Sequence, residues 1–149
     1  MIKLNLYKQS EDKEEHVDIY YSKMNPSIKK VINFFNHEQR ILWGKFDDET
    51  VSIPIIKIYY IESVDRKTFA YMKDNVLEID NTLIELEDML TDYGFVRVSK
   101  SYIVNIYKII KLKPEVNMKI CATFENGEKI YINRSYKKSF NDYLIKMKR

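Results

Sequence analysis

The chain has few of the residues that build most enzyme sites. In 149 residues it has one cysteine, two histidines and three glycines. A single cysteine cannot form an internal disulfide, so nothing requires an oxidising compartment, and we expect Cys121 to be a small core residue. The three glycines, Gly44, Gly94 and Gly127, stand far apart, which excludes a glycine-rich phosphate loop.

The histidines and carboxylates form no catalytic pattern. His16 and His37 show no metal-ligand spacing, and no histidine follows Cys121 to activate it. The carboxylates of residues 85–88 fall on the polar face of an expected helix, and we expect Glu62 to form a structural ion pair. The sequence therefore predicts a protein that is not an enzyme and has no cofactor or metal.

Long apolar runs are also missing. No run approaches the roughly 20 residues that a membrane-spanning helix needs. Residues 1–8 alternate between apolar and polar and then become charged, unlike a signal peptide. We therefore expect a cytoplasmic protein without membrane insertion, built as one domain with a small extension.

Acidic residues are scarce in the second part of the chain. The whole chain carries only +3, but residues 90–149 hold 13 basic and 5 acidic residues, whereas residues 1–89 hold 12 basic and 17 acidic residues. A basic half of a folded domain suits a polyanion. Lysine-rich surfaces are common, however, so this asymmetry alone is modest evidence.

Residues 1–46 are expected to form a small ββαβ extension that carries no chemistry. Alternation predicts strands at residues 2–6 and 16–22, joined by a polar, acidic connection. Asn25 followed by Pro26 predicts a helix start, and apolar residues at helical spacing continue to about His37. A third strand is expected at residues 40–46, and the extension is a candidate dimerisation element.

Residues 50–149 predict a mostly β (α+β) domain with short helices. Strands are expected at residues 51–53, 58–63, 68–72, 76–79, within 106–112, and at 118–124 and 129–133, the last two joined by an Asn-Gly hairpin turn. A helix capped by Asp80 or Asn81 is expected to end at Gly94, and a short helix to close the chain after a basic loop at residues 134–138.

Residues 95–105, FVRVSKSYIVN, lie at the centre of the argument. The two ends resemble strands, with Phe95, Val98 and Ile103 expected to point inward and Arg97 and Lys100 outward. The middle, Ser-Lys-Ser, offers one positive charge and two short hydroxyl donors, which suits a phosphate or a base edge. An ordinary turn with a solvated lysine explains the same residues equally well.

Three expected loops share basic, amide and hydroxyl side chains. Loops on a β scaffold commonly carry binding residues, and arginine, lysine, serine and asparagine are the types that contact bases and phosphates. Three unrelated solvated loops remain the alternative at this point. The candidate DNA-binding residues are Arg66, Lys67 and Thr68 in the first loop, Ser99, Lys100 and Ser101 in the second, and Asn133, Arg134, Tyr136, Lys137 and Lys138 in the third.

These residues resemble a known family. The runs IYYIES at 58–63, FVRVSKSYIVN at 95–105, NGEKI at 126–130 and NRSY at 133–136 are similar, in this order, to the LytTR DNA-binding domain of bacterial transcription factors. The resemblance implies a β-rich domain at residues 50–149 whose loops enter successive DNA grooves. It implies base contacts by Arg134 first and Lys100 second, and Asn105 stands where the family has a buried asparagine as often as a contact.

The resemblance also bears on control and partners. About 50 residues precede the domain, too few for the receiver domain found in many members, so we expect a stand-alone regulator. Members commonly bind paired direct repeats in double-stranded DNA, which predicts a homodimer at least on DNA. Some stand-alone members are controlled by a companion membrane protein, and the sequence does not decide whether this one is.

Two other functions compete with the DNA-binding regulator. A protein-interaction module that regulates a partner without binding DNA would suit the acidic extension and its tyrosines. A metal-dependent nuclease is the weaker option.

Overall fold

The computed structural model describes residues 2–148 of the chain, and most of its elements are short strands. The strands are β1 Ile41–Phe46, β2 Glu49–Pro54, β3 Tyr60–Val64, β4 Lys67–Tyr71, β5 Val76–Ile79, β6 Phe95–Arg97, β7 Tyr102–Asn105, β8 Ile109–Pro114, β9 Ile120–Phe124 and β10 Lys129–Ile132. The helices are α1 Pro26–Gln39, α2 Leu83–Leu90 and α3 Lys137–Lys148, with 3-10 turns η1 Ile55–Lys57, η2 Thr91–Tyr93, η3 Ile106–Lys108, η4 Val116–Met118 and η5 Arg134–Tyr136. The expected mostly β, α+β class is confirmed.

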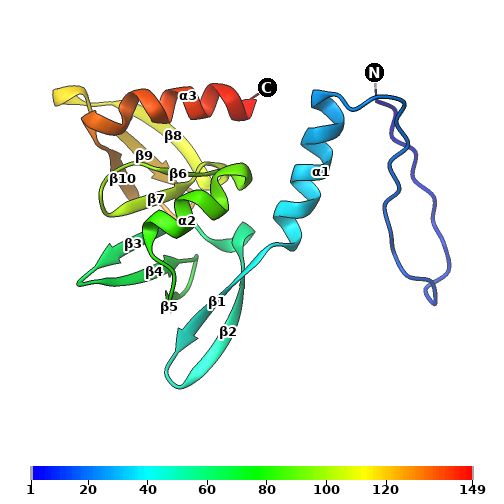
Figure 1. Ribbon diagram of the computed structural model, residues 1–149, viewed down its shortest axis with the longest axis horizontal. Helices are drawn as coiled ribbons and strands as arrows, with labels where there is room; N and C mark the ends of the chain where they lie inside the picture. Colours follow the sequence, from blue (N-terminus) through cyan, green and yellow to red (C-terminus); the bar gives the residue numbers. More distant parts are fainter. Residues whose placement is uncertain (1, 149) are drawn as a thin grey trace.

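Two antiparallel sheets form the body (Figure 1). The larger sheet has the order β2-β1-β5-β4-β3-β7-β6, and the smaller has the order β10-β9-β8. Most neighbouring strands are consecutive in the chain, except β1 with β5 and β3 with β7. Helix α2 and helix α3 cover opposite sides of the larger sheet. The result is a layered domain with a sheet at its centre.

The larger sheet is buried on both faces, which explains its apolar strands. One core packs Ile61, Ile103 and Phe95 against the apolar stripe of α2. The other packs the alternate residues, such as Val96 and Val104, against the smaller sheet and α3. Successive strand residues therefore enter different cores, because side chains alternate across a sheet. Phe95, Val98 and Ile103 are all buried as expected, but Val98 belongs to the second core.

Helix α2 begins one residue later than the sequence suggested. The cap is Thr82, whose hydroxyl accepts a hydrogen bond from the backbone N–H of Glu85, and not Asp80 or Asn81. Asn81 donates to the Glu85 carboxylate instead. Gly94 ends this region with a φ of 94°, as expected, and a Cβ there would meet the Tyr107 ring at 2.3 Å.

The amino-terminal prediction is only half right. Helix α1 forms, and Asn25 caps it by accepting from the N–H of Ile28. The strands expected at residues 2–6 and 16–22 do not form, because alternation alone is insufficient without a partner strand, and an isolated hairpin is marginal in water. These residues project away from the sheets beside α1 (Figure 1).

Strand β1 belongs to the larger sheet and not to a separate ββαβ unit. It pairs with β2 along its whole length and with β5 at Gly44 and Lys45. The sequence predicted a boundary between an extension at residues 1–46 and a domain at residues 50–149. The pairing of β1 crosses this boundary, so β1 is part of the sheet of residues 50–149. No helix among residues 2–148 is both long and apolar enough to cross a membrane.

Candidate nucleic-acid interface

The first basic loop is the tight turn between β3 and β4. Val64 pairs with Lys67, which leaves Asp65 and Arg66 as the two turn residues. Both have positive φ, 51° and 66°, the conformation of the turn that matches strand twist and normally selects Asn-Gly. Arg66 is therefore held exposed at the tip in a conformation that costs a non-glycine residue energy.

The second loop, residues 98–101, is shaped by two side chains. The Ser99 hydroxyl accepts hydrogen bonds from the backbone N–H groups of Ser101 and Tyr102 at 3.2 and 3.1 Å. Arg97 donates to the carbonyl oxygens of Ser99 and Lys100 at 3.0 and 2.7 Å, and to Glu87 at 3.2 Å. Ser99 and Arg97 thus fix the loop, and Lys100 is left exposed at its turn.

The third loop joins β10 to α3 and is more ordered than predicted. Asn133 accepts a hydrogen bond from the N–H of Arg134, and residues 134–136 form the turn η5. Helix α3 begins directly afterwards at Lys137, so residues 134–138 are a turn and the start of a helix and not an open loop. Arg134 and Lys138 are exposed.

Backbone hydrogen bonds join the three loops into one row. The N–H of Ser63, next to the first loop, donates to the carbonyl of Ser101, and the N–H of Asn133 donates to the carbonyl of Val98. All three loops lie at the side of the domain away from α1 (Figure 1). Neighbouring strands are about 4.8 Å apart, so the tips of the first two hairpins are about 10 Å apart, comparable with the width of a DNA major groove.

Not every predicted residue reaches this surface. Thr68 is buried, with 7% of its surface exposed, because it points inward from β4, so its side chain does not reach the surface formed by the other candidate residues. Tyr136 and Lys137 are half-buried, and Tyr136 packs on the second core. Asn105 is fully buried and donates to the carbonyl of Ile58, which is a structural role.

The structure adds two lysines that the sequence reasoning missed. Lys119 and Lys129 line a shallow pocket with Ser99, Tyr102 and Asn133, between the second and third loops. The sequence could have identified Lys129, because the alternation of residues 129–133 turns Ile130 and Ile132 inward and Lys129 outward. The basic surface therefore extends from the loops onto the outer face of the smaller sheet.

Glu62 lies behind the loops with tyrosines as partners. Tyr71 and Tyr102 each donate a hydrogen bond to its carboxylate at 2.8 Å. The expectation of an ion pair was therefore wrong, because the partners of Glu62 are tyrosine hydroxyls and not a cation. Burial, reinforced by the bond to Glu62, raises the pKa of Tyr71 and Tyr102 to about 12. Burial also raises the pKa of Tyr60, which stacks on Tyr71. This cluster ties β3, β4 and β7 together beneath the basic row.

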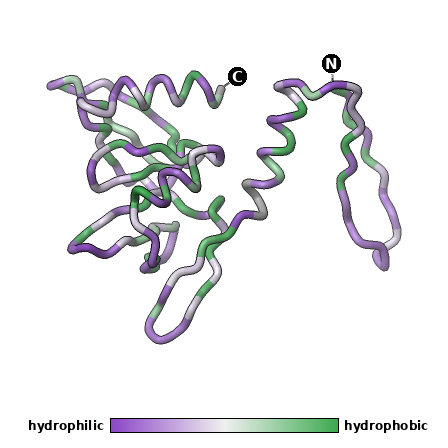
Figure 2. Tube along the Cα trace, viewed as in Figure 1, coloured by the Kyte–Doolittle hydropathy of each residue, from purple (hydrophilic) through white to green (hydrophobic). Residues whose placement is uncertain are grey.

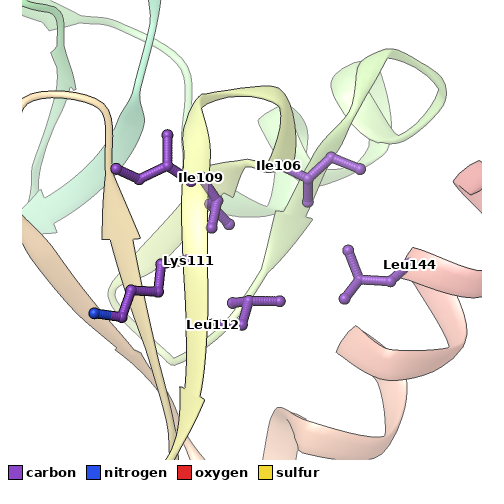
Figure 3. Close-up of a pocket in the computed structure, with 6 residues that line it drawn as sticks. Ile106, Ile109, Lys111, Leu112 and Leu144 are labelled. Carbon is purple, nitrogen blue, oxygen red and sulfur yellow. The ribbon is translucent and has the colours of Figure 1, made fainter.

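No group of three metal-ligating side chains occurs within the described part of the chain. A second pocket is lined mainly by aliphatic residues of β8 and by Leu144 of α3 (Figure 3), and it shares no lining residue with the pocket of Lys119 and Lys129. Its lining offers no group that would contact a phosphate strongly except Lys111. The candidate interface is therefore the row of three loops with the adjoining lysines.

Comparisons with known proteins match this chain to one family and one fold. Residues 48–145 match the model of the LytTr DNA-binding domain family. The fold resembles the solved structure of a LytTr DNA-binding domain from Bacillus cereus, with a TM-score of 0.68 and 26% identity, over 71% of this chain and 97% of that one.

Full-length relatives come from Staphylococcus aureus. Proteins of strains NCTC 8325 and MRSA252, both named uncharacterized HTH-type transcriptional regulators, are 32% and 31% identical over 146 residues, covering 97% of this chain and 99% of each relative. Among residues 2–148, strands follow both α1 and α2 before the next α-helix, so the described chain has no helix-turn-helix pair. The family match covers well over half of the chain, and the protein belongs to the LytTR DNA-binding domain family.

Proposed function

We propose that this protein is a sequence-specific DNA-binding transcriptional regulator that reads double-stranded DNA through the row of three loops. The observation that carries the proposal is that backbone hydrogen bonds join the three loops that carry the exposed side chains of Arg66, Lys100 and Arg134. Three basic tips held on a rigid sheet can follow the surface of a duplex, whereas three unconnected loops would have to be ordered on binding.

The residues divide by role. Arg134 is the first base-reading residue and Lys100 the second, because both are exposed at loops whose backbones are fixed by hydrogen bonds. Lys67, Lys138, Lys119 and Lys129 supply charge for phosphates, which sets affinity and position without selecting sequence. Ser99 and Arg97 shape the second loop and Thr68 is left out.

Two protomers on paired direct repeats are part of the proposal. One row of three loops is short for a DNA site, and two copies double the base contacts and the phosphate contacts. The relatives are named transcriptional regulators over nearly the whole length that they share with this chain, which supports the regulatory role.

The experiment compares Arg134→Ala with Lys138→Ala. We expect Arg134→Ala to reduce discrimination against one or two base pairs of the site by about 1–3 kcal/mol, and Lys138→Ala to weaken all duplexes alike and lower the salt slope by about 1. Fluorescence anisotropy with specific and scrambled duplexes measures both. Equal losses on both duplexes for both variants would refute the assignment of roles.

A further inference from the structure

The amino-terminal arm, residues 2–24, exposes an unusual number of large apolar side chains. Leu4, Leu6, Tyr7 and Tyr20 are 82–90% exposed. The arm keeps the alternation of a strand, with Ile2, Leu4 and Leu6 on one side, yet it forms no strand in the single chain. Apolar positions recur along the arm (Figure 2). Soluble monomers rarely leave such a surface uncovered.

Strand β8 offers the complementary feature. It stands at the end of the smaller sheet and, within residues 2–148, pairs only with β9, so its outer edge has free backbone groups. Free edges tend to pair with another strand. Ile110 and Leu112 on this strand are 65% and 40% exposed.

A groove runs along this edge. It has a volume of about 220 Å³ and is lined by Ile106, Ile109, Ile110, Lys111 and Leu112 with Leu144 of α3. Leu144 faces Ile106 and Leu112 across the opening between α3 and β8 (Figure 3). The groove is smaller than the roughly 300 Å³ of the smallest usual ligand pockets. Its aliphatic lining beside a strand suits a few aliphatic side chains of another segment.

The arm and the groove also match in charge. Residues 8–18, which follow the apolar start of the arm, hold five carboxylates and two lysines. Strand β8 and its approach carry Lys108, Lys111 and Lys113. An arm paired along β8 brings the acidic segment close to these lysines, and opposite charges favour the encounter.

The size of the contact suits a dimer. All four large apolar residues among residues 2–7 are more than half exposed: Ile2, Leu4, Leu6 and Tyr7. A reciprocal exchange covers two arms and two grooves, and an aromatic side chain such as Tyr7 alone buries roughly 150–250 Å². The total is of the order of the 1,600 Å² (about 800 Å² per partner) of a standard stable interface.

We propose that residues 2–7 of one protomer add as a strand to the free edge of β8 in a second copy of this chain, with Leu4 and Leu6 seated in the groove between β8 and α3. In strand addition the backbone hydrogen bonds give affinity and the alternate side chains give specificity. A second copy is the occupant because each arm extends away from its own β8 (Figure 1). This surface is separate from the DNA interface, so its test needs no DNA.

The test is light scattering coupled to size-exclusion chromatography of the full chain. We expect a dimer for the wild type, and a dissociation constant at least tenfold higher for the arm variant Leu4→Lys/Leu6→Lys and for the groove variant Ile110→Lys. Ile84→Lys is the matched control, because Ile84 is equally apolar and 75% exposed but lies on α2. All replaced side chains are exposed, so circular dichroism should show unchanged folds.

Two further measurements complete the test. The arm variant retains a groove and the groove variant retains an arm, so we expect an equimolar mixture to form a heterodimer. Oxidation of Leu4→Cys protein mixed with Leu112→Cys protein is expected to give a covalent dimer containing both variants. A monomeric wild type, a dimer unchanged in both the arm and the groove variant, or no disulfide between the Leu4→Cys and Leu112→Cys proteins after oxidation would overturn the proposal.

Discussion

At the scale of single residues, the shape of the three-loop row depends on the backbone conformation of its turns and on hydrogen bonds between side chains and the backbone. Arg66 shows this most clearly, because it sits at a turn whose positive φ favours glycine. Arg97 and Ser99 hold the second loop through the backbone without lying at its tip. In the second loop, the candidate side chain of Lys100 is therefore exposed because Arg97 and Ser99 use their own hydrogen bonds to hold the loop in shape.

Replacement of Arg66 by glycine separates fold stability from DNA affinity. We expect Arg66→Gly to raise the free energy of unfolding by about 1 kcal/mol, because the left-handed conformation no longer costs energy. The same change should weaken DNA binding about tenfold, because a charge-assisted contact of roughly 1.5 kcal/mol is lost. Urea unfolding and anisotropy titration measure the two effects.

Asp47→Gly is the matched control for Arg66→Gly. Asp47 also has a positive φ, 52°, and lies in the turn between β1 and β2, outside the basic row. It should gain stability and keep DNA affinity unchanged. If Arg66→Gly binds DNA as tightly as the wild type, the first loop makes no contact.

The tyrosines on Glu62 predict how stability depends on pH. The pKa of Tyr71 and Tyr102 is about 12 in the fold and about 10 in an unfolded chain, so the fold favours their neutral form. The stability they contribute is complete below pH 10 and is lost as the pH rises from about 10 to 12. Absorbance at 295 nm should show two tyrosines ionising near pH 12.

Glu62→Gln tests the cause of these pKa values. Burial is the larger contribution and the carboxylate the next, so the variant should lower both pKa values without returning them fully to 10. Glu78→Gln, on the neighbouring strand β5, is the control for removing a carboxylate. Unchanged tyrosine titration in Glu62→Gln would contradict the assigned hydrogen bonds.

At the scale of elements, strong local patterns were predictable and pairing was not. Residues 95–105 have β-branched and aromatic residues at both ends and Ser-Lys-Ser between them, so both strands and the turn follow from sequence, and the Asn-Gly turn fixes the hairpin of β9 and β10. Residues 2–6 alternate between apolar and polar but find no partner in the chain, and local periodicity contains no information about partners. The burial of Thr68 was missed because the exact turn residues decide which side chain faces inward.

The cap of α2 gives a prediction at this scale. Thr82→Ala should lower the free energy of unfolding by about 1 kcal/mol, because the N–H of Glu85 loses its acceptor. Asn81→Ala should cost only about 0.2–0.5 kcal/mol, because it removes an exposed side-chain contact. Urea unfolding of both variants checks the order, and a reversed order would make Asn81 the true cap.

At the scale of the whole molecule, charge and apolar surface are separated in space. The basic row lies on one side of the domain and the apolar arm on the other (Figure 1). This arrangement leaves DNA binding and self-association free to act together, since neither uses the surface of the other. The family and the basic half were predictable from sequence, whereas the hydrogen-bonded row and the missed lysines Lys119 and Lys129 required the fold.

The most direct measurement of the central claim is selection from a random-sequence duplex pool, at two salt concentrations, followed by sequencing of the bound fraction. We predict one enriched motif, repeated at a fixed spacing, and affinity that falls with salt by a slope of about −0.9 for each phosphate contacted. Binding without enrichment, or no binding at either salt concentration, would contradict sequence reading by the three-loop row.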